Sequence, residues 1–508
     1  MGKFQWVLVL FIYHIISNPF HTTFDIVALI SFHFPPSIMM VHKPVNVLHQ
    51  CKIGPPPGSA VPVAADIPLT FFDQLWLPLP SQQILYFYHY PYPTTNFTQV
   101  LLPHIKLSLS STLIHFYPIA GNLSWPHDSY RPVVRYVNGD FIMLTVAESD
   151  ADFSSLSGDH VRDANEAYAF VPHLQSSGPV VPVVAIQITV FPNSGISIGV
   201  TNRHSFTDGR SMDHFFGTWA MISKLGDTNQ YLSTLSVPFL DRTLIKDPNG
   251  IEKIYLKELE GFMGSDKLVS GNRSLRAMDI KMQADCPMFR ATFDLNPTDI
   301  RRLKDWILVL RNKDQPSHHI STFVAICAFS WVGLLKAEAS ATTELEESNN
   351  NMTSFMIGVD CRGRKEMDPL IPSTYFGNCV KPILVPGEKS KLLKEDGVVV
   401  ATELIGEAIR GLEKGVLRGL EDGVSDILHM ESKQIIQTSG SPRFGVYESD
   451  FGWGNPKKVE FVSTDKTGGI FMKKSRKLDG GIEIDVALDK KKMDAFASMF
   501  DNKFKAAL

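Results

Sequence analysis

The stretch that decides the fold is VPVVAIQITVFPNSGISIGVTNRHSFTDG, residues 181–209. Its two apolar runs meet at Pro-Asn-Ser-Gly, which is typical of a turn between paired strands. Directly after it, apolar side chains recur at helical spacing, which predicts a helix. The pattern therefore predicts a β-hairpin, with His204 at the end of its second strand and Asp208 in the turn before the helix.

This placement leaves two interpretations of His204 and Asp208 open. A histidine at a strand end can project into a cleft and take a proton near neutral pH. It can equally be a structural histidine, with Asp208 holding the turn. The spacing alone is weak evidence, because 16 histidines make about one chance match expected. A second match, His21 and Asp25, has no strand before it and is set aside.

The rest of the chain alternates strand-like and helix-like segments, which predicts an α/β protein. With 508 residues, two domains are expected. We place an N-terminal domain at 41–240, a crossover at 241–260 and a C-terminal domain at 261–508. Strands are expected at 45–53 and 354–360, and helices at 95–116, 296–310 and 321–339.

The first forty residues differ in character from the rest of the chain. MGKFQWVLVLFIYHII has one basic residue and an apolar run of signal-peptide length, but no small-residue cleavage site comes after it. We expect residues 1–40 to be an extension outside the fold. A secretory signal or a membrane anchor is the alternative.

Composition excludes several classes of protein. Lys plus Arg number 49 and Asp plus Glu 53, and the sequence has no long basic run. We therefore expect no positively charged surface of the kind that binds nucleic acid. The five cysteines are odd in number and widely spaced, which favours a reduced cytoplasmic protein over a disulfide framework or a zinc site. We expect no metal, and we also expect no bound cofactor.

A second motif, DFGWG at residues 450–454, also allows two interpretations. In a protein kinase, Asp450 would hold magnesium, but neither an HRD loop nor a glycine-rich phosphate loop accompanies it. The remaining interpretation is a tight turn in which Gly452 and Gly454 give backbone freedom, Phe451 and Trp453 pack, and Asp450 pairs with a basic residue.

In combination, these motifs resemble the BAHD family of plant acyl-CoA-dependent acyltransferases. Further matches run in order along residues 41–508: IPLTFFDQLWL (67–77), HFYPIAGNLSWP (115–126), PFLDRTLIKDP (238–248), STFVAICAFSWV (321–332), DCRGR (360–364), YFGNC (375–379), GSPRFGVYESDFGWG (440–454) and GGIEIDVALDKKKMDAF (480–496). YFGNC resembles the clade that acylates sugar hydroxyls of anthocyanin, flavonoid and phenolic glucosides.

The resemblance implies two chloramphenicol-acetyltransferase-like domains of similar size with a channel between them. It implies transfer of a malonyl group from malonyl-CoA to a glucoside, at the 6-hydroxyl of glucose, without an acyl-enzyme. Hydroxycinnamoyl-CoA is the alternative donor, and a non-catalytic relative is the alternative in another class. The resemblance also implies a monomer in the cytoplasm, with no membrane or nucleic-acid partner.

The resemblance also assigns roles to residues. His204 is the expected general base, and Asp208 is expected to point away from substrate and pair with Arg362, or failing that with Arg364. Asp450 is expected to serve domain architecture rather than proton transfer.

Other roles stay open at this point. Ser321 and Thr322 are candidates for contact with coenzyme A, or else caps of the helix that they precede. The oxyanion donor is not assigned. Some relatives supply an indole N–H from a tryptophan upstream of DFGWG, but the same segment here, QTSGSPRF (437–444), contains no tryptophan. Ser439, Ser441 or a backbone N–H could serve.

Two departures from the family pattern stand out. Arg203 precedes His204 where His or Asn is common, and strand alternation predicts that it points away from the site. If the turn redirects it, Arg203 could bind the malonate carboxylate. RKLDGGIEID (476–485) also departs from RDxxGGxEIG, and we expect this segment at the surface.

Overall fold

The computed structural model describes residues 45–226, 236–264, 268–269, 271–278, 287–311, 319–341, 351–365, 367–430 and 434–504. The expected extension at 1–40 and the fifth cysteine, Cys286, lie outside these ranges. Residues Pro44–Leu508 form one compact unit. The fold within it confirms the α/β prediction.

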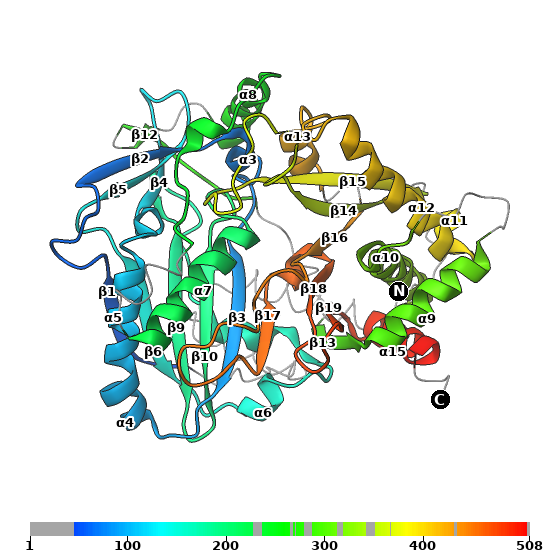
Figure 1. The fold of residues 1–508 in the computed structure, drawn as a ribbon, viewed down its shortest axis with the longest axis horizontal. Coiled ribbons are helices and arrows are strands. Elements are labelled where there is room, and N and C mark those ends of the chain that lie inside the picture. Colours follow the sequence, from blue (N-terminus) through cyan, green and yellow to red (C-terminus); the bar gives the residue numbers. More distant parts are fainter. Residues whose placement is uncertain are drawn as a thin grey trace, which may run out of the picture. The chain divides into compact units, whose positions relative to one another are not determined.

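Three sheets carry the described strands (Figure 1). The first has the order β1 (Asn46–Ile53), β6 (Ile142–Glu148), β9 (Val184–Phe191), β10 (Gly195–Asn202), β3 (Gln82–His89) and β17 (Lys458–Phe461). The second has the order β11 (Leu268–Val269), β12 (Asn272–Arg273), β4 (Asn122–Pro126), β5 (Val133–Val137) and β2 (Ala64–Pro68), with β8 (Val180–Pro182) on β4. The third has the order β15 (Val380–Glu388), β14 (Met352–Asp360), β16 (Ile435–Ser439), β18 (Ile470–Lys474), β19 (Ile482–Asp489), β13 (Met288–Leu295) and β7 (Arg162–Asp163).

Helices pack on these sheets. The α-helices are α3 (Phe71–Gln74), α4 (Thr94–Asn96), α5 (Leu102–Thr112), α6 (Phe153–Leu156), α7 (Gly209–Leu225), α8 (Ile251–Met263), α9 (Pro297–Leu310), α10 (Thr322–Ala341), α11 (Lys389–Leu392), α12 (Gly397–Arg410), α13 (Gly423–Leu428), α14 (Thr464–Thr467) and α15 (Lys490–Phe504). A π-helical turn, η1 (Phe97–Leu101), precedes α5, and short 3₁₀ turns are η2 (Tyr117–Ala120), η3 (Ala164–Phe170), η4 (Arg242–Leu244) and η5 (Gly411–Lys414).

The hairpin predicted from the opening stretch is β9 and β10, which pair antiparallel along their whole length. Every residue of both strands is buried, which explains why their sequences are apolar without strict alternation. Helix α7 begins seven residues after the end of β10. Its N-cap is Asp208, whose carboxylate accepts the backbone N–H of Ser211 at 2.9 Å, and Gly226 in the left-handed conformation ends it.

The two large sheets exchange strands. β17, from the C-terminal part of the chain, pairs with β3 in the first sheet, and β7, from the N-terminal part, pairs with β13 in the third. No cut at one point in the chain separates these sheets. The boundaries 41–240, 241–260 and 261–508 therefore stay a prediction, with most of α8 inside the expected crossover region.

Helix α10 is the centre of the C-terminal helical layer, against α9, α12 and α15 (Figure 1). It is apolar around its whole circumference and is, within the described ranges, the one helix long and apolar enough to cross a membrane. However, 72% of its most apolar window is buried inside the protein. A helix that is apolar on all sides and largely buried in this way is typical of a protein core.

The expectation that residues 476–485 lie at the surface is wrong for residues 481–485, which are all buried, and most clearly for Asp485. This residue is fully buried on β19 and is bonded to the ammonium group of Lys473 and to the hydroxyl of Thr292. The charge is tolerated because its partners neutralise it and complete its hydrogen bonds. The loop before β19 does reach solvent, with Leu478 exposed.

Candidate active site

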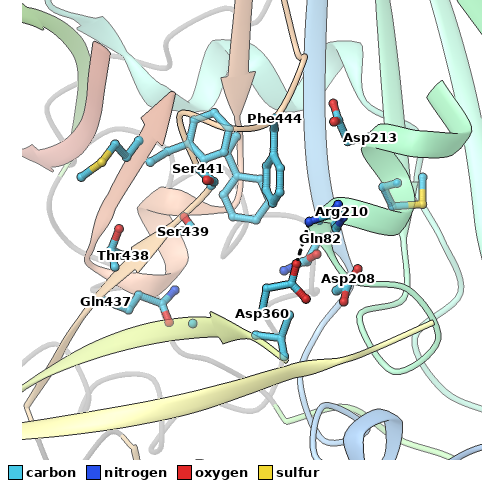
Figure 2. A pocket seen from close by; sticks show the side chains of 18 of the residues that line it. Gln82, Asp208, Arg210, Asp213, Asp360, Gln437, Thr438, Ser439, Ser441 and Phe444 are labelled. Atoms are coloured by element: carbon cyan, nitrogen blue, oxygen red, sulfur yellow. Dashed lines mark hydrogen bonds and ion pairs between the residues drawn. The ribbon is translucent and has the colours of Figure 1, made fainter. Parts of the chain in front are cut away.

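A cavity of about 850 Å³ opens beside the end of β10, and both large sheets contribute to its wall. Figure 2 shows Asp208 and Arg210 at the start of α7, and Thr438 and Ser439 facing them from β16. Asp360, at the end of β14, forms an ion pair with Arg210 at 2.9 Å. The remaining wall is largely apolar and includes Trp76, Ile84, Tyr86, Val200, Phe216, Phe323, Met356, Phe461, Phe471 and Met472.

His204 lies two residues after β10 and lines this cavity. Its ring stacks on the indole of Trp76, with centroids 4.3 Å apart and planes 14° from parallel. Its Nδ1 lies 3.1 Å from Oδ1 of Asn378. Burial lowers the pKa of His204 below its ordinary 6.5, although a bond to its own main-chain carbonyl, and then Asp208, Asn378 and Asp73, act in the opposite direction. The ring is therefore neutral near pH 7 and able to accept a proton.

The carboxylate of Asp208 is engaged in a buried ion pair at the edge of the cavity. One of its oxygens lies 2.8 Å from Nη1 of Arg362, and both side chains are 1% exposed. The carboxylate also accepts the backbone N–H groups of Ser211 and Cys379. Burial alone would raise the pKa of Asp208, but Arg362 and these donors lower it below its ordinary value. The expected partner of Asp208 is thus present, and Asp208 joins α7 to the segment after Phe376.

The alternative partner, Arg364, does not contact Asp208. Its Nε donates to the carbonyl of Asp360 at 2.8 Å, and the side chain lines the cavity. Arg203 lies elsewhere, as strand alternation predicts. Its guanidinium donates to the carbonyls of Pro182 and Gln175, and it does not line the cavity. The alternative in which Arg203 reaches a bound malonate therefore has no support in this geometry.

The carboxylate of Asp450 organises a turn and does not line the cavity. It accepts the backbone N–H groups of Gly452 and Gly454 at 2.8 and 2.9 Å and pairs with Lys224 on α7 at 2.8 Å. Both glycines have positive φ, +104° and +103°, so the turn requires them. This arrangement supports the architectural role predicted for Asp450.

The aromatic residues of the same motif pack beneath α7. Phe451 is buried and meets Phe216 and Trp219 edge to face, while Trp453 stacks on Phe451 and packs against Tyr88. DFGWG thus ties the C-terminal part of the chain to the helix after His204. Its influence on the site is indirect.

Ser321 and Thr322 differ in their contacts: Ser321 caps the helix, and Thr322 lines the cavity. The hydroxyl oxygen of Ser321 accepts the backbone N–H of Val324 at 3.2 Å, as a helix cap does. Thr322, the first residue of α10, lines the cavity together with Phe323. Thr322 is therefore the better placed of the two to contact a bound coenzyme A.

Both serines considered as oxyanion donors line the cavity, at and after the end of β16 (Figure 2). The hydroxyl of Ser439 donates to the carbonyl of Ile470 at 3.2 Å, which occupies its proton. The oxygen of Ser441 instead accepts the backbone N–H of Arg443 at 3.2 Å. Because accepting leaves its own proton available, Ser441 is the better candidate of the two.

Sequence reasoning did not single out three residues of the site: Trp76, Asp73 and Asn378. Trp76 and Asp73 belong to IPLTFFDQLWL and Asn378 to YFGNC, segments that carried the resemblance but no residue roles. A polar residue inside a quoted motif was the available signal. The contacts of these residues at the site could not be inferred, because their partners there lie more than 100 positions away in the chain.

Gly377 allows a close approach that any side chain would block. A Cβ at this position would overlap Nη1 of Arg242, a buried guanidinium that donates to the hydroxyl of Tyr375 at 2.7 Å. We expect Gly377→Ala to lower the free energy of unfolding by about 1–3 kcal/mol and to lower turnover, because Arg242 or the neighbouring Asn378 must move. Thermal unfolding and steady-state kinetics measure both effects.

The matched control is Gly217→Ala. An added Cβ at Gly217, an exposed position on α7, meets nothing within 4 Å. It should leave turnover unchanged and stabilise the protein by up to about 1 kcal/mol, because alanine favours the helix. Equal losses in the two variants would contradict the steric explanation.

Comparison with known proteins identifies the family. A sequence model of the Transferase family matches residues 56–503. The chain therefore belongs to this family, the BAHD acyltransferases, as the motifs indicate, and it is an enzyme that transfers acyl groups.

Relatives of known activity match over most of the chain. Phenolic glucoside malonyltransferase 1 of Nicotiana tabacum is 37% identical, covering 90% of this chain and 98% of its own length. The Salvia splendens malonyl-coenzyme:anthocyanin 5-O-glucoside-6'''-O-malonyltransferase is 36% identical (91% and 96%). An Arabidopsis thaliana coumaroyl-CoA:anthocyanidin 3-O-glucoside-6''-O-coumaroyltransferase is 34% identical (92% and 99%).

Solved structures share the fold. The crystal structure of vinorine synthase superimposes with a TM-score of 0.63 at 18% identity, covering 89% of this chain and 96% of that one. The F. sporotrichioides TRI101 structure complexed with coenzyme A and T-2 gives a TM-score of 0.57 at 18% identity, over 85% and 96%. At such identities the likeness concerns the fold alone.

Proposed function

We propose that this enzyme transfers a malonyl group from malonyl-CoA to a sugar hydroxyl of a phenolic, flavonoid or anthocyanin glucoside, at the 6-hydroxyl of glucose. The observation that carries the proposal is a partly buried His204 at the wall of a large cavity, with a pKa that desolvation lowers below its ordinary value. Relatives named as malonyltransferases of phenolic and anthocyanin glucosides, 36–37% identical to this chain, support the donor and acceptor class.

The proposed chemistry is direct transfer with His204 as general base. The imidazole takes the proton of the sugar hydroxyl as its oxygen attacks the thioester carbonyl, and a tetrahedral oxyanion forms. When it collapses, the carbon–sulfur bond breaks, and the imidazolium returns its proton to the coenzyme A thiolate. The stacked indole of Trp76 supports the transient imidazolium through its π face, and Ser441 is the candidate donor to the oxyanion.

The cavity wall offers features suited to either donor. Three guanidinium groups, those of Arg210, Arg364 and Arg443, line it and suit the free carboxylate of a malonyl group. Aromatic side chains such as Phe323 and Phe444 also line it and suit a coumaroyl ring. A relative named as a coumaroyltransferase is 34% identical. Coumaroyl-CoA is therefore the second candidate donor, acting through the same His204 chemistry.

A donor-by-acceptor assay on the full chain tests the proposal. Malonyl-CoA and coumaroyl-CoA would each be offered with phenolic, flavonoid and anthocyanin glucosides, with release of free coenzyme A as the readout and mass spectrometry of the product. Turnover with malonyl-CoA and a glucoside is expected. Turnover with coumaroyl-CoA alone would show that coumaroyl-CoA and not malonyl-CoA is the donor. No turnover with any pair would favour the non-catalytic alternative.

The pH dependence of kcat/KM is a further prediction. The base must be neutral, and burial lowers the pKa of His204, so the neutral form persists to lower pH than for an ordinary histidine. We expect kcat/KM to keep more than half of its plateau value at about pH 6.5, the ordinary pKa of histidine, and to reach its half-value at more acidic pH. Rates measured across the mildly acidic to neutral range at subsaturating substrate would show this fall at acidic pH, the acid limb of the profile.

Asp213 provides the control for this profile. It lines the same cavity, and burial raises its pKa to about 6, so its titration overlaps the range. Asp213→Asn should leave the acid limb in place if His204 is responsible. Disappearance of the limb in this variant would assign it to Asp213 instead.

We also propose that the enzyme acts as a monomer in the cytoplasm. The cysteines among the described residues, Cys51, Cys327, Cys361 and Cys379, are free thiols, which supports a reducing compartment. Light scattering would measure the mass in solution, and a fusion of residues 1–40 to a fluorescent reporter would test the signal or anchor alternative.

A further inference from the structure

The side chain of Asn378 lies between His204 and Asp73. Its Oδ1 is 3.1 Å from Nδ1 of His204. Its Nδ2 is bonded on the other side to Oδ1 of Asp73, at 3.0 Å, and to the main-chain carbonyl of His204, at 2.6 Å. Asn378 is fully buried, so these contacts are its hydrogen-bonding environment.

The identity of the partners fixes the orientation of this amide. The Asp73 carboxylate and the His204 carbonyl are both acceptors, so the group facing them must be the NH₂ that donates to both. The opposite orientation would set an oxygen against two oxygens in a buried place, which is strongly unfavourable. The amide oxygen is therefore the atom that faces the imidazole.

We propose that Asn378 is the positioning residue that fixes the tautomer of the catalytic base. An amide oxygen only accepts, so Nδ1 of His204 must carry the hydrogen, and Nε2 is then the bare nitrogen that takes the proton of the sugar hydroxyl. This inference rests on the proposed function of His204. It gives the orienting role to a neutral amide, whereas Asp208, four residues after His204, is engaged with Arg362.

Asp73 holds Asn378 in this orientation. Its carboxylate accepts the N–H and hydroxyl of Thr70 and both the backbone and side-chain N–H groups of Asn378. Arg242 lies behind it at 3.7 Å. The charged groups that bear on His204 are thus Asp73, backed by Arg242, and Asp208, backed by Arg362, and neither carboxylate bonds the imidazole directly.

The tautomer can be measured without turnover. Nitrogen-15 NMR of the full chain with labelled histidine distinguishes a ring nitrogen that carries hydrogen from a bare one, and the signals missing in His204→Gln identify His204. At a pH where the ring is neutral, we expect Nδ1 to be protonated and Nε2 bare. A His204 ring protonated mainly at Nε2 would overturn the proposal.

Kinetics of an Asn378 variant provide the second test. Asn378→Ala removes the acceptor, and we expect kcat to fall about 100-fold with little change in the KM for malonyl-CoA. The same substitution removes a hydrogen bond that raises the pKa of His204, so the acid limb of kcat/KM should also move to lower pH in Asn378→Ala.

Asn138→Ala is the matched control, because Asn138 is exposed in the turn after β5 and does not line the cavity. It should leave both kcat and the acid limb unchanged. Wild-type kcat and an unmoved limb in a folded Asn378→Ala enzyme would overturn the proposal. Full activity of His204→Gln would instead refute His204 as the base, and the NMR experiment would still decide the tautomer.

Discussion

His204→Ala is expected to lower kcat between about 10²- and 10⁴-fold with every acceptor that the wild-type enzyme uses, because it removes the proposed general base. The KM for malonyl-CoA should change little, since in the proposed mechanism the imidazole contacts the sugar hydroxyl and not the donor. Coenzyme A release, followed in steady state with the malonyl-CoA and glucoside pair found active, measures both quantities.

Two further variants distinguish loss of the basic nitrogen from loss of the side chain's packing against Trp76. His204→Gln keeps a planar side chain against Trp76 and should be as inactive as His204→Ala. His160→Gln changes an exposed histidine that lies outside the cavity and should behave as wild type. A His204→Gln enzyme that keeps wild-type kcat would contradict general-base catalysis by His204.

Asp208→Asn is expected to act on stability. The substitution leaves Arg362 buried without its closest carboxylate, and breaking a buried ion pair by removing one partner costs about 3–5 kcal/mol. Asp360, whose carboxylate lies 3.0 Å from the same guanidinium, keeps the loss at the lower end. Chemical denaturation should therefore show unfolding free energy lower by about 3 kcal/mol at neutral pH.

The pH dependence of this difference has a definite sign. Because the folded-state pKa of Asp208 is depressed, its stabilising contribution is present above the unfolded-state value, about 3.9, and is lost as pH falls through the folded-state value. The gap between wild type and Asp208→Asn should thus be full at neutral pH and narrow only in acid, below about pH 4.

The control for this prediction is Asp494→Asn. Asp494 pairs with Lys490 at the surface of α15, where both side chains are more than half exposed. Exposed pairs of this kind contribute about 0–1 kcal/mol, so its removal should be nearly neutral. Equal destabilisation in the two variants would show that burial of the Asp208–Arg362 pair is not the cause.

Local sequence was sufficient to predict the elements around the site. The apolar runs on either side of Pro-Asn-Ser-Gly predicted β9 and β10, and the helical spacing after Gly209 predicted α7. These features depend on neighbouring residues in the chain, through turn geometry, helix capping and the periodicity of burial. The position of His204 at the end of a strand came from them.

The same local rules were wrong about Asp485. The segment 476–485 was expected at the surface, whereas β19 buries Asp485 against Lys473. Its partner lies on β18, the adjacent strand, and pairing between strands decides whether such a charge is neutralised. Side-chain identity alone does not carry that information.

For this protein, the sequence by itself determined the class of fold, the family and the residue expected to act as base, since motifs and periodicities are properties of the chain order. Only the tertiary structure decided what surrounds that base. Asn378 and Asp73 are separated by 305 positions, yet they meet at His204. Such contacts depend on how the sheets and loops pack in three dimensions, and the hydrogen bonds formed there select one orientation of the amide.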